Sequence, residues 1–523
     1  MQTRDWIALA IVLSISAVQV ALSVDSSLPP AEDAAMLMRY AQHLADGHGI
    51  VWNVGERPID GATDFFFMTA IAGGVKAGVP LEIATRALIF AAHVVTVGFV
   101  FVAVRVIIGA PLAAAIASCV YLIFGPASAY VSTYFGAPVF AMSAAAAWLF
   151  ALAIMRGDSR CWLPAAYALC SLVTGLVRPE GVILASLMLI AIAVSIGWNR
   201  ARISVLWFIV IFATLGLSYF LWRWNYFGHP LPNPFYKKGG GALHLGGLKD
   251  SMYNTIKFTL PLLPLYAIGL AHRDTRRATI AVAIPMFGFA CSFILISSEM
   301  NFAGRFQYAI LPMALMAWPI AMERVLTLLG ERGAKRRRIF AACVMVYVIV
   351  SVGFVRLWSD DWAHYPDGRA EMGRMLLQYK DDGLRIATSE AGLIPLYSQC
   401  AALDTWGLND SVIARKGTIT AARLDTFKPD LIVFHAYDSP AVAGTTGLKG
   451  WSEMVAVLRA FVAKHGFELA AAYGVSSEDL HYYYVRSDFA GKIDLMRQIA
   501  VTEYIWSGNG EVAKNFATNV LPN

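Results

Sequence analysis

The chain has 523 residues, of which 58% are hydrophobic and only 15% charged, and its mean hydropathy is +0.56. Soluble domains of this length rarely combine these values, so the composition indicates a membrane protein with many spans. The formal charge of +6 arises in short Lys/Arg clusters between apolar runs. The positive-inside bias explains these clusters, and we expect no nucleic-acid partner.

The predicted membrane spans are apolar runs long enough to cross a bilayer. We expect eleven of them, at residues 6–24, 82–104, 108–124, 135–155, 161–177, 181–198, 203–222, 254–271, 278–297, 306–322 and 339–357. The first run is rather long for a cleaved signal peptide, so we interpret it as a retained span. A further run at 64–79 is short, interrupted by Gly and carries Lys76, which favours an interfacial or half-inserted helix.

Arginine clusters set the expected orientation of these spans. They fall on alternate loops, near residues 156–160, 200–202, 273–277 and 332–338, and therefore mark the cytoplasmic side. With an odd number of crossings, the tail after about Trp358 lies outside. We predict a polytopic all-α membrane domain at 1–357 and a soluble extracytoplasmic α/β domain at 358–523, in a bacterial cytoplasmic (inner) membrane.

In the soluble tail, strands are predicted at "LRIATSEAGLIPLY", "PDLIVFHAY" and "HYYYVRS" and a helix at "WSEMVAVLRAFVAKHGF". The six cysteines of the chain show no spacing typical of disulfides or zinc ligands.

The first outer loop contains "AEDAAMLMRYAQHLADGHGIVWN", in which two adjacent acids precede an amphipathic helical pattern. On a helical wheel, Asp33 falls within the apolar stripe of Met36 and Tyr40, whereas Glu32 lies with Arg39 on the polar side. We therefore expect Glu32 to be solvated and Asp33 to be turned inward, with a raised proton affinity that suits a general base. Capping of the helix N-terminus by Asp33 is the alternative, and it does not exclude catalysis.

Several further polar residues on the expected outer face are candidates for binding substrate. The Gly-rich continuation of the first loop could equally be an ordinary connection, and the Lys pair after "HPLPNPFY" could be a generic headgroup contact. A charge at bilayer depth costs about 2.5 to 3.5 kcal/mol, so Arg178/Glu180 and Glu299/Arg305 either line a cavity or form structural pairs. The candidates are His48, Asn53, Glu56, Arg57, Arg178, Glu180, His229, Asn233, Tyr236, Lys238, Glu299 and Arg305.

The ionisable residues gather on the outer face, whereas the inner loops offer only solvated basic clusters. An anionic, lipid-linked substrate from the outer leaflet fits this asymmetry better than a solute crossing the membrane. A transporter would more often carry its ionisable residues near the midplane of discontinuous helices.

The order of these motifs resembles the GT-C class of integral-membrane glycosyltransferases. Within that class, it is most similar to the terminal β-1,2-arabinofuranosyltransferases of mycobacterial cell walls. The similar segments are "EDAAMLMRY", "GHGIVWNVGERPIDGAT", "YFGHPLPNPFYKKG", "EMNFAGRF" and "ALDTWGLND". This sequence departs from the family pattern by having Glu32 and Glu299 where the family has Asp, and Pro234 where it has Thr, so the donor sugar and the acceptor stay open.

The resemblance implies an inverting transfer of a sugar, with arabinofuranose as one candidate, from a polyprenyl-phosphate donor to an envelope glycan or lipid. Asp33 would act as the base with Glu32 in support, an exchange of these two roles being the alternative, while Arg305 and Lys238 would stabilise the leaving phosphate. Glu32, Arg39, His48 and Glu56 would bind sugar hydroxyls or orient Asp33. In the outer domain, Asp404 and Asn409 would help to cover the site and receive the acceptor.

The expected partners are the lipid-linked donor, the envelope acceptor and membrane lipids, bound by a monomer. A requirement for a divalent cation is left open. The alternatives are a non-enzymatic transporter or flippase of envelope lipids or polysaccharides, and a GT-C enzyme that acts on protein or lipid A.

Overall fold

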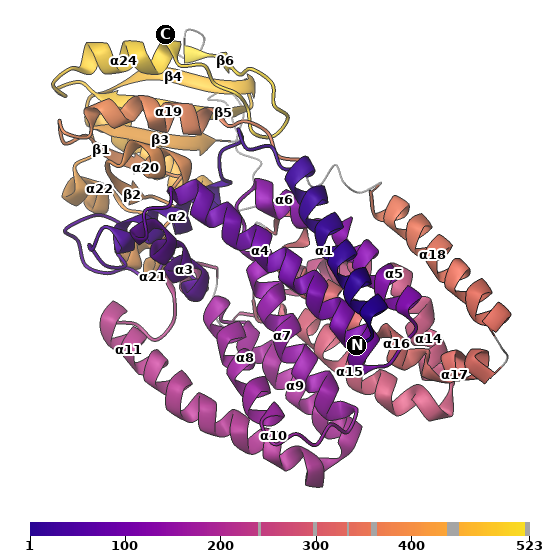
Figure 1. The fold of residues 1–523 in the computed structure, drawn as a ribbon. Coiled ribbons are helices and arrows are strands. Elements are labelled where there is room, and N and C mark those ends of the chain that lie inside the picture. The colour runs from indigo at the N-terminus through magenta and orange to yellow at the C-terminus, as the bar shows by residue number, and fades with distance from the viewer. Residues whose placement is uncertain (239–241, 297–300, 332–333, 357–362, 437–448, 518–523) are drawn as a thin grey trace.

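The computed structural model describes residues 1–523 except 239–241, 297–300, 332–333, 357–362, 437–448 and 518–523. Figure 1 shows two parts, a bundle of helices from the N-terminal two thirds of the chain and a mixed sheet with covering helices from the remainder. The expected domain boundary between residues 357 and 358 lies outside the described residues and stays a prediction.

The helical part contains α1 to α18. Their bounds are α1 (Thr3–Ser23), α2 (Glu32–Ala45), α3 (Phe65–Lys76), α4 (Leu81–Val102), α5 (Leu112–Ile123), α6 (Ala127–Ser132), α7 (Ala137–Met155), α8 (Leu163–Val177), α9 (Gly181–Ile196), α10 (Trp198–Ile211), α11 (Leu217–Phe227), α12 (Asn233–Lys237), α13 (Leu245–Thr259), α14 (Leu263–Ala271), α15 (Arg273–Ser292), α16 (Ile310–Ala321), α17 (Glu323–Glu331) and α18 (Ala334–Arg356). Short π-helical segments at Ala103–Ile107 and Phe212–Gly216 extend α4 and join α10 to α11.

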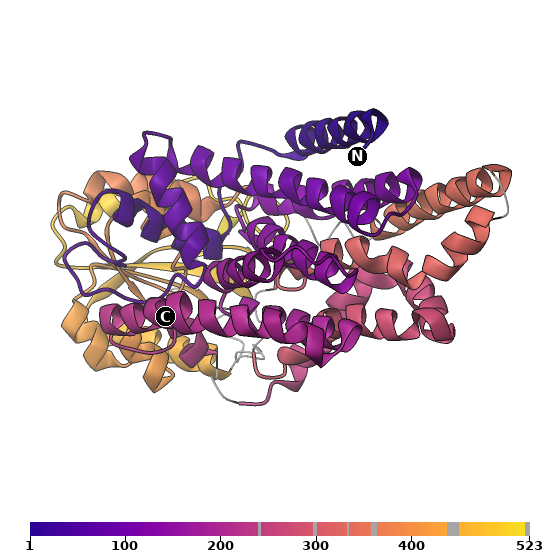
Figure 2. The ribbon, with the colours of Figure 1, turned by 60° about the horizontal axis from the view of Figure 1, so that its bottom comes forward.

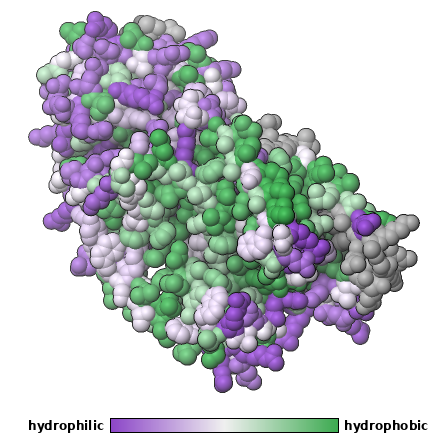
Figure 3. Space-filling model, in the orientation of Figure 1, coloured by the Kyte–Doolittle hydropathy of each residue, from purple (hydrophilic) through white to green (hydrophobic). Residues whose placement is uncertain are grey.

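Among the described residues, four helical stretches are long and apolar enough to cross a membrane, namely Thr3–Ser23, Leu81–Ile107, Ala137–Met155 and Trp198–Phe227. Helices occur at all of the expected spans, but the others are too short or too polar to count as crossings by themselves, so a total of eleven is not confirmed. The run at 64–79 forms the short α3. Figure 3 shows a hydrophobic band between the hydrophilic sheet domain and a hydrophilic lower rim, the surface that a membrane protein presents to a bilayer.

The long α10–α11 helix runs along the outside of the bundle, and α1 lies on the bundle surface against α4 (Figure 2). Few side chains of either helix are buried, since only 22% of the apolar window in α1 and 6% of that in α10–α11 lie inside the molecule. These exposed apolar faces are available to lipid.

The second part is built on one six-stranded sheet of order β2-β1-β3-β5-β4-β6. Its strands are β1 (Arg385–Thr388), β2 (Ala401–Asp404), β3 (Leu431–Ala436), β4 (Phe467–Ser476), β5 (Asp479–Arg486) and β6 (Lys514–Asn515). Strands β2, β1 and β3 are parallel and the rest pair antiparallel. Its helices are α19 (Gly368–Leu376), α20 (Leu393–Ser398), α21 (Ser411–Lys416), α22 (Ala421–Phe427), α23 (Lys449–Lys464) and α24 (Lys492–Val501).

Apolar side chains cover both faces of this sheet. Leu376 of α19 and Ile499 of α24 belong to one core, and Leu424 of α22 and Leu458 of α23 belong to the other. Strand β3, "LIVFHA", is buried at every residue except His435, and its first four residues are all apolar because both faces of the sheet are covered.

The predictions for this domain were partly right. Strands β3 and β5 and helix α23 lie where they were expected. The stretch "LRIATSEAGLIPLY" is a strand only in its first half, and its second half is α20. Strands β2, β4 and β6 were missed. In β4, "FELAAAYGVS" is rich in alanine, which is a weak strand former.

Candidate active site

A cavity of about 480 Å³ lies between the helical part and the sheet domain. Its walls come from the first turn of α2, the loop before α3, the α6–α7 and α8–α9 connections, α12 and the segment around Phe306, and Leu408 reaches it from the sheet domain. The charged side chains that line it are Asp33, Asp64, Arg178, Glu180, Lys238 and Arg305. These six residues are far apart in the sequence but line the same cavity.

Asp33 forms an ion pair with Arg305 inside this cavity. Arg305 follows a tight turn in which Ala303 and Gly304 have φ angles of 50° and 70°. The Tyr130 hydroxyl donates to the Ala303 carbonyl at 2.8 Å and holds that turn. The guanidinium lies 3.9 Å from the centre of the Phe135 ring, so it is fixed both by charge and by an aromatic face.

The proton affinity predicted for Asp33 was wrong in direction. Burial alone raises the pKa of this carboxyl, but the cations of Arg305 and Lys238 outweigh burial and hold the pKa below its usual value. The helical wheel reports only the faces of α2 and contains no information about cations that arrive from distant loops. Asp33 is therefore an ionised carboxylate paired with cations.

Glu32 was expected to be the solvated acid, and this was also wrong. Its carboxylate accepts from the backbone N–H of Leu393 at 3.0 Å and pairs with Arg369 Nε at 3.3 Å, so it faces the sheet domain and not the cavity. Burial, partly offset by Arg369, raises the pKa of Glu32 to about 8. The polar side of α2 is thus the docking face for the sheet domain.

A second group of charged side chains also lines the cavity. Arg178 Nη2 pairs with Glu180 Oε1 at 2.7 Å, and its Nε lies 4.0 Å from Asp64 Oδ1. Burial raises the pKa of Asp64. The Phe306 ring lies near both arginines, 4.7 Å from Arg178 Cζ and 5.1 Å from Arg305 Cζ. Two cations therefore flank one aromatic ring at the cavity surface.

The two neighbouring lysines have different surroundings. Lys238 lines the cavity and lowers the pKa of Asp33, whereas Lys237 donates to the Gly417 carbonyl at 2.5 Å and lies 3.8 Å from the centre of the Trp406 ring. Of the two lysines, Lys238 is thus the one that lines the cavity, and its role at a phosphate stays a prediction.

Arg39 and Asn53 dock the sheet domain instead of lining the cavity. The Arg39 guanidinium donates to the carbonyl of Pro395 and to that of Cys400 at 2.8 Å. The Asn53 side chain pairs with both backbone groups of Ala402 on the edge strand β2, at 2.9 and 3.0 Å. Asn53 therefore satisfies backbone groups that an edge strand such as β2 would otherwise leave unpaired.

Asp404 and Asn409 shape the loop after β2. Asp404 accepts from the N–H groups of Gly407 and Asn409 at 2.9 and 2.8 Å, and Asn409 Oδ1 accepts from the Tyr40 hydroxyl at 3.0 Å. This loop carries Leu408 to the cavity. Both residues therefore position the loop of the sheet domain that contributes Leu408 to the cavity wall.

The remaining predicted candidates that fall within the described residues do not line the cavity. His48, Glu56 and Arg57 are exposed, and Glu299 lies outside the described residues. His229 and Tyr236 are half-buried, and Asn233 is buried with its N–H donated to the Asp60 carbonyl at 2.9 Å. His229, Asn233 and Tyr236 therefore lie close in sequence to the lining residues Leu231 and Phe235 without lining the cavity themselves.

Sequence reasoning missed Asp64 as a site residue. The available signal was an acid directly before the apolar run "FFFMTA", a pattern that fits the N-cap that Asp64 occupies on α3. The buried Asp60–Arg223 pair, at 2.6 Å, was missed as well and ties the first loop to α11.

The acids at this cavity do not form a set of metal ligands. Asp33 is paired with Arg305, and Asp64 and Glu180 share Arg178. Among the described residues, the one trio of His, Cys, Asp or Glu at ligand spacing lies in the sheet domain. The arginines beside these acids suit an anionic group.

Several solved structures share this fold at low sequence identity. ArnT from Cupriavidus metallidurans in the apo state aligns with a TM-score of 0.60 and 14% identity, covering 92% of this chain and 98% of that one. The archaeal oligosaccharyltransferase AglB from Archaeoglobus fulgidus has a TM-score of 0.55 and 11% identity, covering 93% and 74%. The mycobacterial arabinofuranosyltransferase AftD has a TM-score of 0.52 and 15% identity, covering 94% and 40%.

These similarities assign the chain to the GT-C glycosyltransferase fold, which agrees with the predicted fold class. Residues 358–486 also match a family model described as a domain of unknown function (DUF8728). No curated protein matches the chain.

Proposed function

We propose that this protein is a membrane glycosyltransferase that takes a sugar from a polyprenyl-phosphate donor. The observation that carries the proposal is the meeting of Asp33 with Arg305 and Lys238 in one cavity roofed by the sheet domain. A carboxylate beside cations matches the needs of sugar transfer from a phosphate, which requires an acceptor for a proton and positive charge for the leaving group.

The apolar part of the cavity supports a lipid-linked donor. The residues that make up this apolar part include Ile183, Leu231, Phe293 and Ile296. Two of the similar structures were determined with lipid phosphates, ArnT with undecaprenyl phosphate and AglB with a dolichol-phosphate. By analogy, the donor phosphate would lie against Arg305 and Lys238, with its first isoprene units against the apolar wall.

In the proposed reaction the acceptor hydroxyl oxygen attacks the anomeric carbon and forms the new glycosidic bond. The bond from that carbon to the phosphate oxygen breaks, and polyprenyl phosphate leaves on the opposite face, which inverts the anomeric configuration. Asp33 takes the hydroxyl proton, while Arg305 and Lys238 balance the charge on the phosphate. A low pKa keeps Asp33 ionised and ready to accept the proton as the hydroxyl becomes acidic in the transition state.

The proposal also covers the donor sugar, the acceptor and the location of the protein. The similarity to AftD and the motif order favour arabinofuranose as the first donor to test, with an envelope glycan or lipid as acceptor. We place the protein as a monomer in the bacterial cytoplasmic membrane, with the sheet domain outside. Arg305 and Lys238 would supply positive charge for the leaving group, and a requirement for a divalent cation is left open.

The test is transfer by the full-length protein in nanodiscs, with a panel of polyprenyl-phosphate pentoses and hexoses and envelope extracts as acceptors. Mass spectrometry should detect a new glycoside with at least one donor. Asp33→Asn should lower kcat by about 10²-fold or more with an unchanged melting temperature and unchanged donor binding.

Near-normal turnover by Asp33→Asn would remove Asp33 from the role of base, and Asp64→Asn in the same assay tests the other acid of the cavity. Movement of the lipid-linked sugar across the bilayer without a new glycosidic bond would instead support a flippase.

A further inference from the structure

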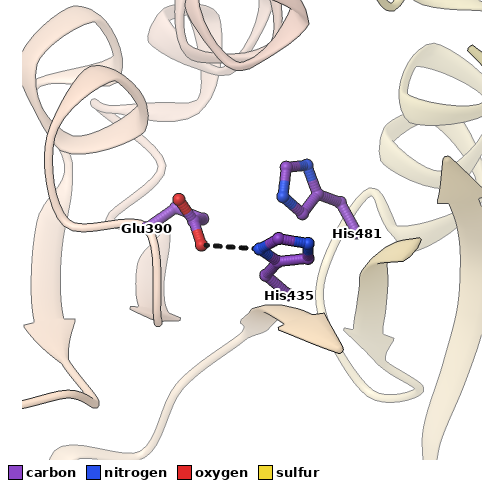
Figure 4. Close-up of side chains that lie close together, drawn as sticks. All are labelled: Glu390, His435 and His481. Atoms are coloured by element: carbon purple, nitrogen blue, oxygen red, sulfur yellow. Dashed lines mark ion pairs between the residues drawn. The ribbon is translucent and has the colours of Figure 1, made fainter. Parts of the chain in front are cut away.

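Glu390, His435 and His481 converge in the sheet domain, outside the cavity described above. One ligand atom from each side chain lies within 4.8 Å of those of the other two. His435 on β3 and His481 on β5 are paired directly across the two strands, and Glu390 follows β1, the parallel neighbour of β3. Figure 4 shows the carboxylate of Glu390 facing the two imidazoles. The sheet itself therefore brings the three groups together.

His481 provides a nitrogen without a partner in this cluster. The residue is 3% exposed, and its Nε2 makes no hydrogen bond within the described part of the chain. Its Nδ1 lies 2.5 Å from the Tyr504 hydroxyl, which fixes the ring. When Nδ1 donates to that hydroxyl oxygen, the lone pair of Nε2 points toward Glu390 (Figure 4). A buried nitrogen without a partner is costly unless a ligand satisfies it.

His435 is oriented in the way that metal-bound histidines usually are. Its Nε2 lies 2.5 Å from Asp479 Oδ1, and its Nδ1 faces Glu390 Oε1 at 3.8 Å. A carboxylate on the far nitrogen of an imidazole sets the tautomer and raises the basicity of the nitrogen that faces the metal. The main chain of His435 is held as well, by the Ser389 hydroxyl at 3.0 Å and the Trp451 indole at 2.9 Å.

Carboxylates outnumber cations around this cluster. Arg369 forms ion pairs with Asp367, Glu390 and Glu32. Its single positive charge is therefore shared among three carboxylates, and Asp479 adds a fourth carboxylate beside His435. Clustered acids in a partly dry environment repel one another, and a divalent ion beside Glu390 would offset that repulsion.

We propose that Glu390, His435 and His481 bind a Zn²⁺ ion that stabilises the sheet domain. Two imidazoles and a carboxylate form a set that zinc commonly takes, with water as the fourth ligand. The ion would join the ends of β1, β3 and β5. Through Arg369, it would also brace the contact that Glu32 makes with the sheet domain. This site is separate from the cavity of the proposed transferase and does not depend on its activity.

The test uses the full-length protein in detergent, stripped with a chelator and then titrated with Zn²⁺. The wild type should bind one zinc ion per chain by elemental analysis, and its melting temperature should rise on binding. Added Co²⁺ should give the strong visible absorption of a four-coordinate nitrogen and oxygen site. Glu390→Gln and His481→Gln should weaken zinc binding by at least about 100-fold and abolish the rise in melting temperature.

Two further variants keep the test decisive if His481→Gln does not fold. Asp479→Asn changes only the residue that orients His435 and should weaken zinc binding by about 10- to 100-fold. His465→Gln alters a histidine that stacks on Phe461 at the end of α23 and should bind zinc like the wild type. The proposal is overturned if the folded wild type binds no zinc, or if Glu390→Gln and Asp479→Asn bind it as tightly as the wild type.

Discussion

Two adjacent acids at the start of α2 have separate roles because they face separate parts of the molecule. Asp33 faces the cavity and Arg305, whereas Glu32 faces Arg369 and the N–H of Leu393 in the sheet domain. One residue of separation turns a helical side chain by about 100°. The same helix turn therefore carries one carboxylate that lines the cavity and one that docks the sheet domain.

Lys238 should influence the acid side of the pH–rate profile. Its charge lowers the pKa of Asp33, and Asp33 must be ionised to accept a proton, so activity is lost as the pH falls through that pKa. Lys238→Gln removes the charge and raises the pKa, which should move the acid limb of kcat/KM to higher pH and raise the donor KM about tenfold. Lys237→Gln, which alters a contact with Gly417 and Trp406, is the matched control. Equal effects of the two variants would contradict the assignment.

Asp404 should make stability depend on pH. Burial raises its pKa from 3.8 to about 6, so the folded state binds this proton more tightly than the unfolded state does. Its contribution is then greatest below pH 4 and is lost as the pH rises toward 6, by about 3 kcal/mol at most. In Asp404→Asn, melting curves between pH 4 and 7 should lack this component, whereas Asp425→Asn, on an exposed side chain, should follow the wild type. Parallel curves for all three proteins would refute the effect.

At the scale of elements, α20 packs against the first turn of α2 through Gly392. A Cβ atom at Gly392 would lie 2.2 Å from the Glu32 carbonyl oxygen, a backbone atom that cannot move without shifting α2. We expect Gly392→Ala to destabilise the protein by roughly 1–3 kcal/mol and to make the sheet domain more sensitive to protease. Gly73→Ala on α3 meets nothing within 4 Å and should leave the melting temperature unchanged or slightly higher. If both variants melt alike, the contact between α2 and α20 does not hold the domains together.

The sequence was informative where local pattern decides structure and uninformative where distant segments meet. Apolar runs located the helices, and the buried run of β3 located a strand. The pattern of α2 could not reveal that its polar side docks on α20, because a docking face and a solvated face have the same composition. The pKa of Asp33 depends on Arg305 and Lys238, which reach it through loops that periodicity does not place.

At the scale of the whole molecule, the cavity lies at the boundary between a lipid-facing bundle and a hydrophilic domain. Figure 3 shows the hydrophobic band ending where the sheet domain begins. A lipid-linked donor could keep its chain in that band while its phosphate reaches Arg305, and a hydrophilic acceptor could approach from the sheet domain. The arrangement explains why one wall of the cavity is apolar and why Leu408 of the sheet domain completes it.

This arrangement requires the sheet domain and the turn between α7 and α8 to lie on opposite sides of the membrane. Glu478 is exposed in the turn between β4 and β5, and Cys161 is exposed in the turn between α7 and α8, beside the Arg156 and Arg160 cluster. Since positive clusters favour the cytoplasm, Cys161 should resist a membrane-impermeant maleimide in intact spheroplasts and react only after permeabilisation. In a Cys161→Ser background, Glu478→Cys should react without permeabilisation. Reaction of both thiols from the same side would contradict the placement of the sheet domain outside, and with it the delivery of donor and acceptor from opposite sides of the cavity.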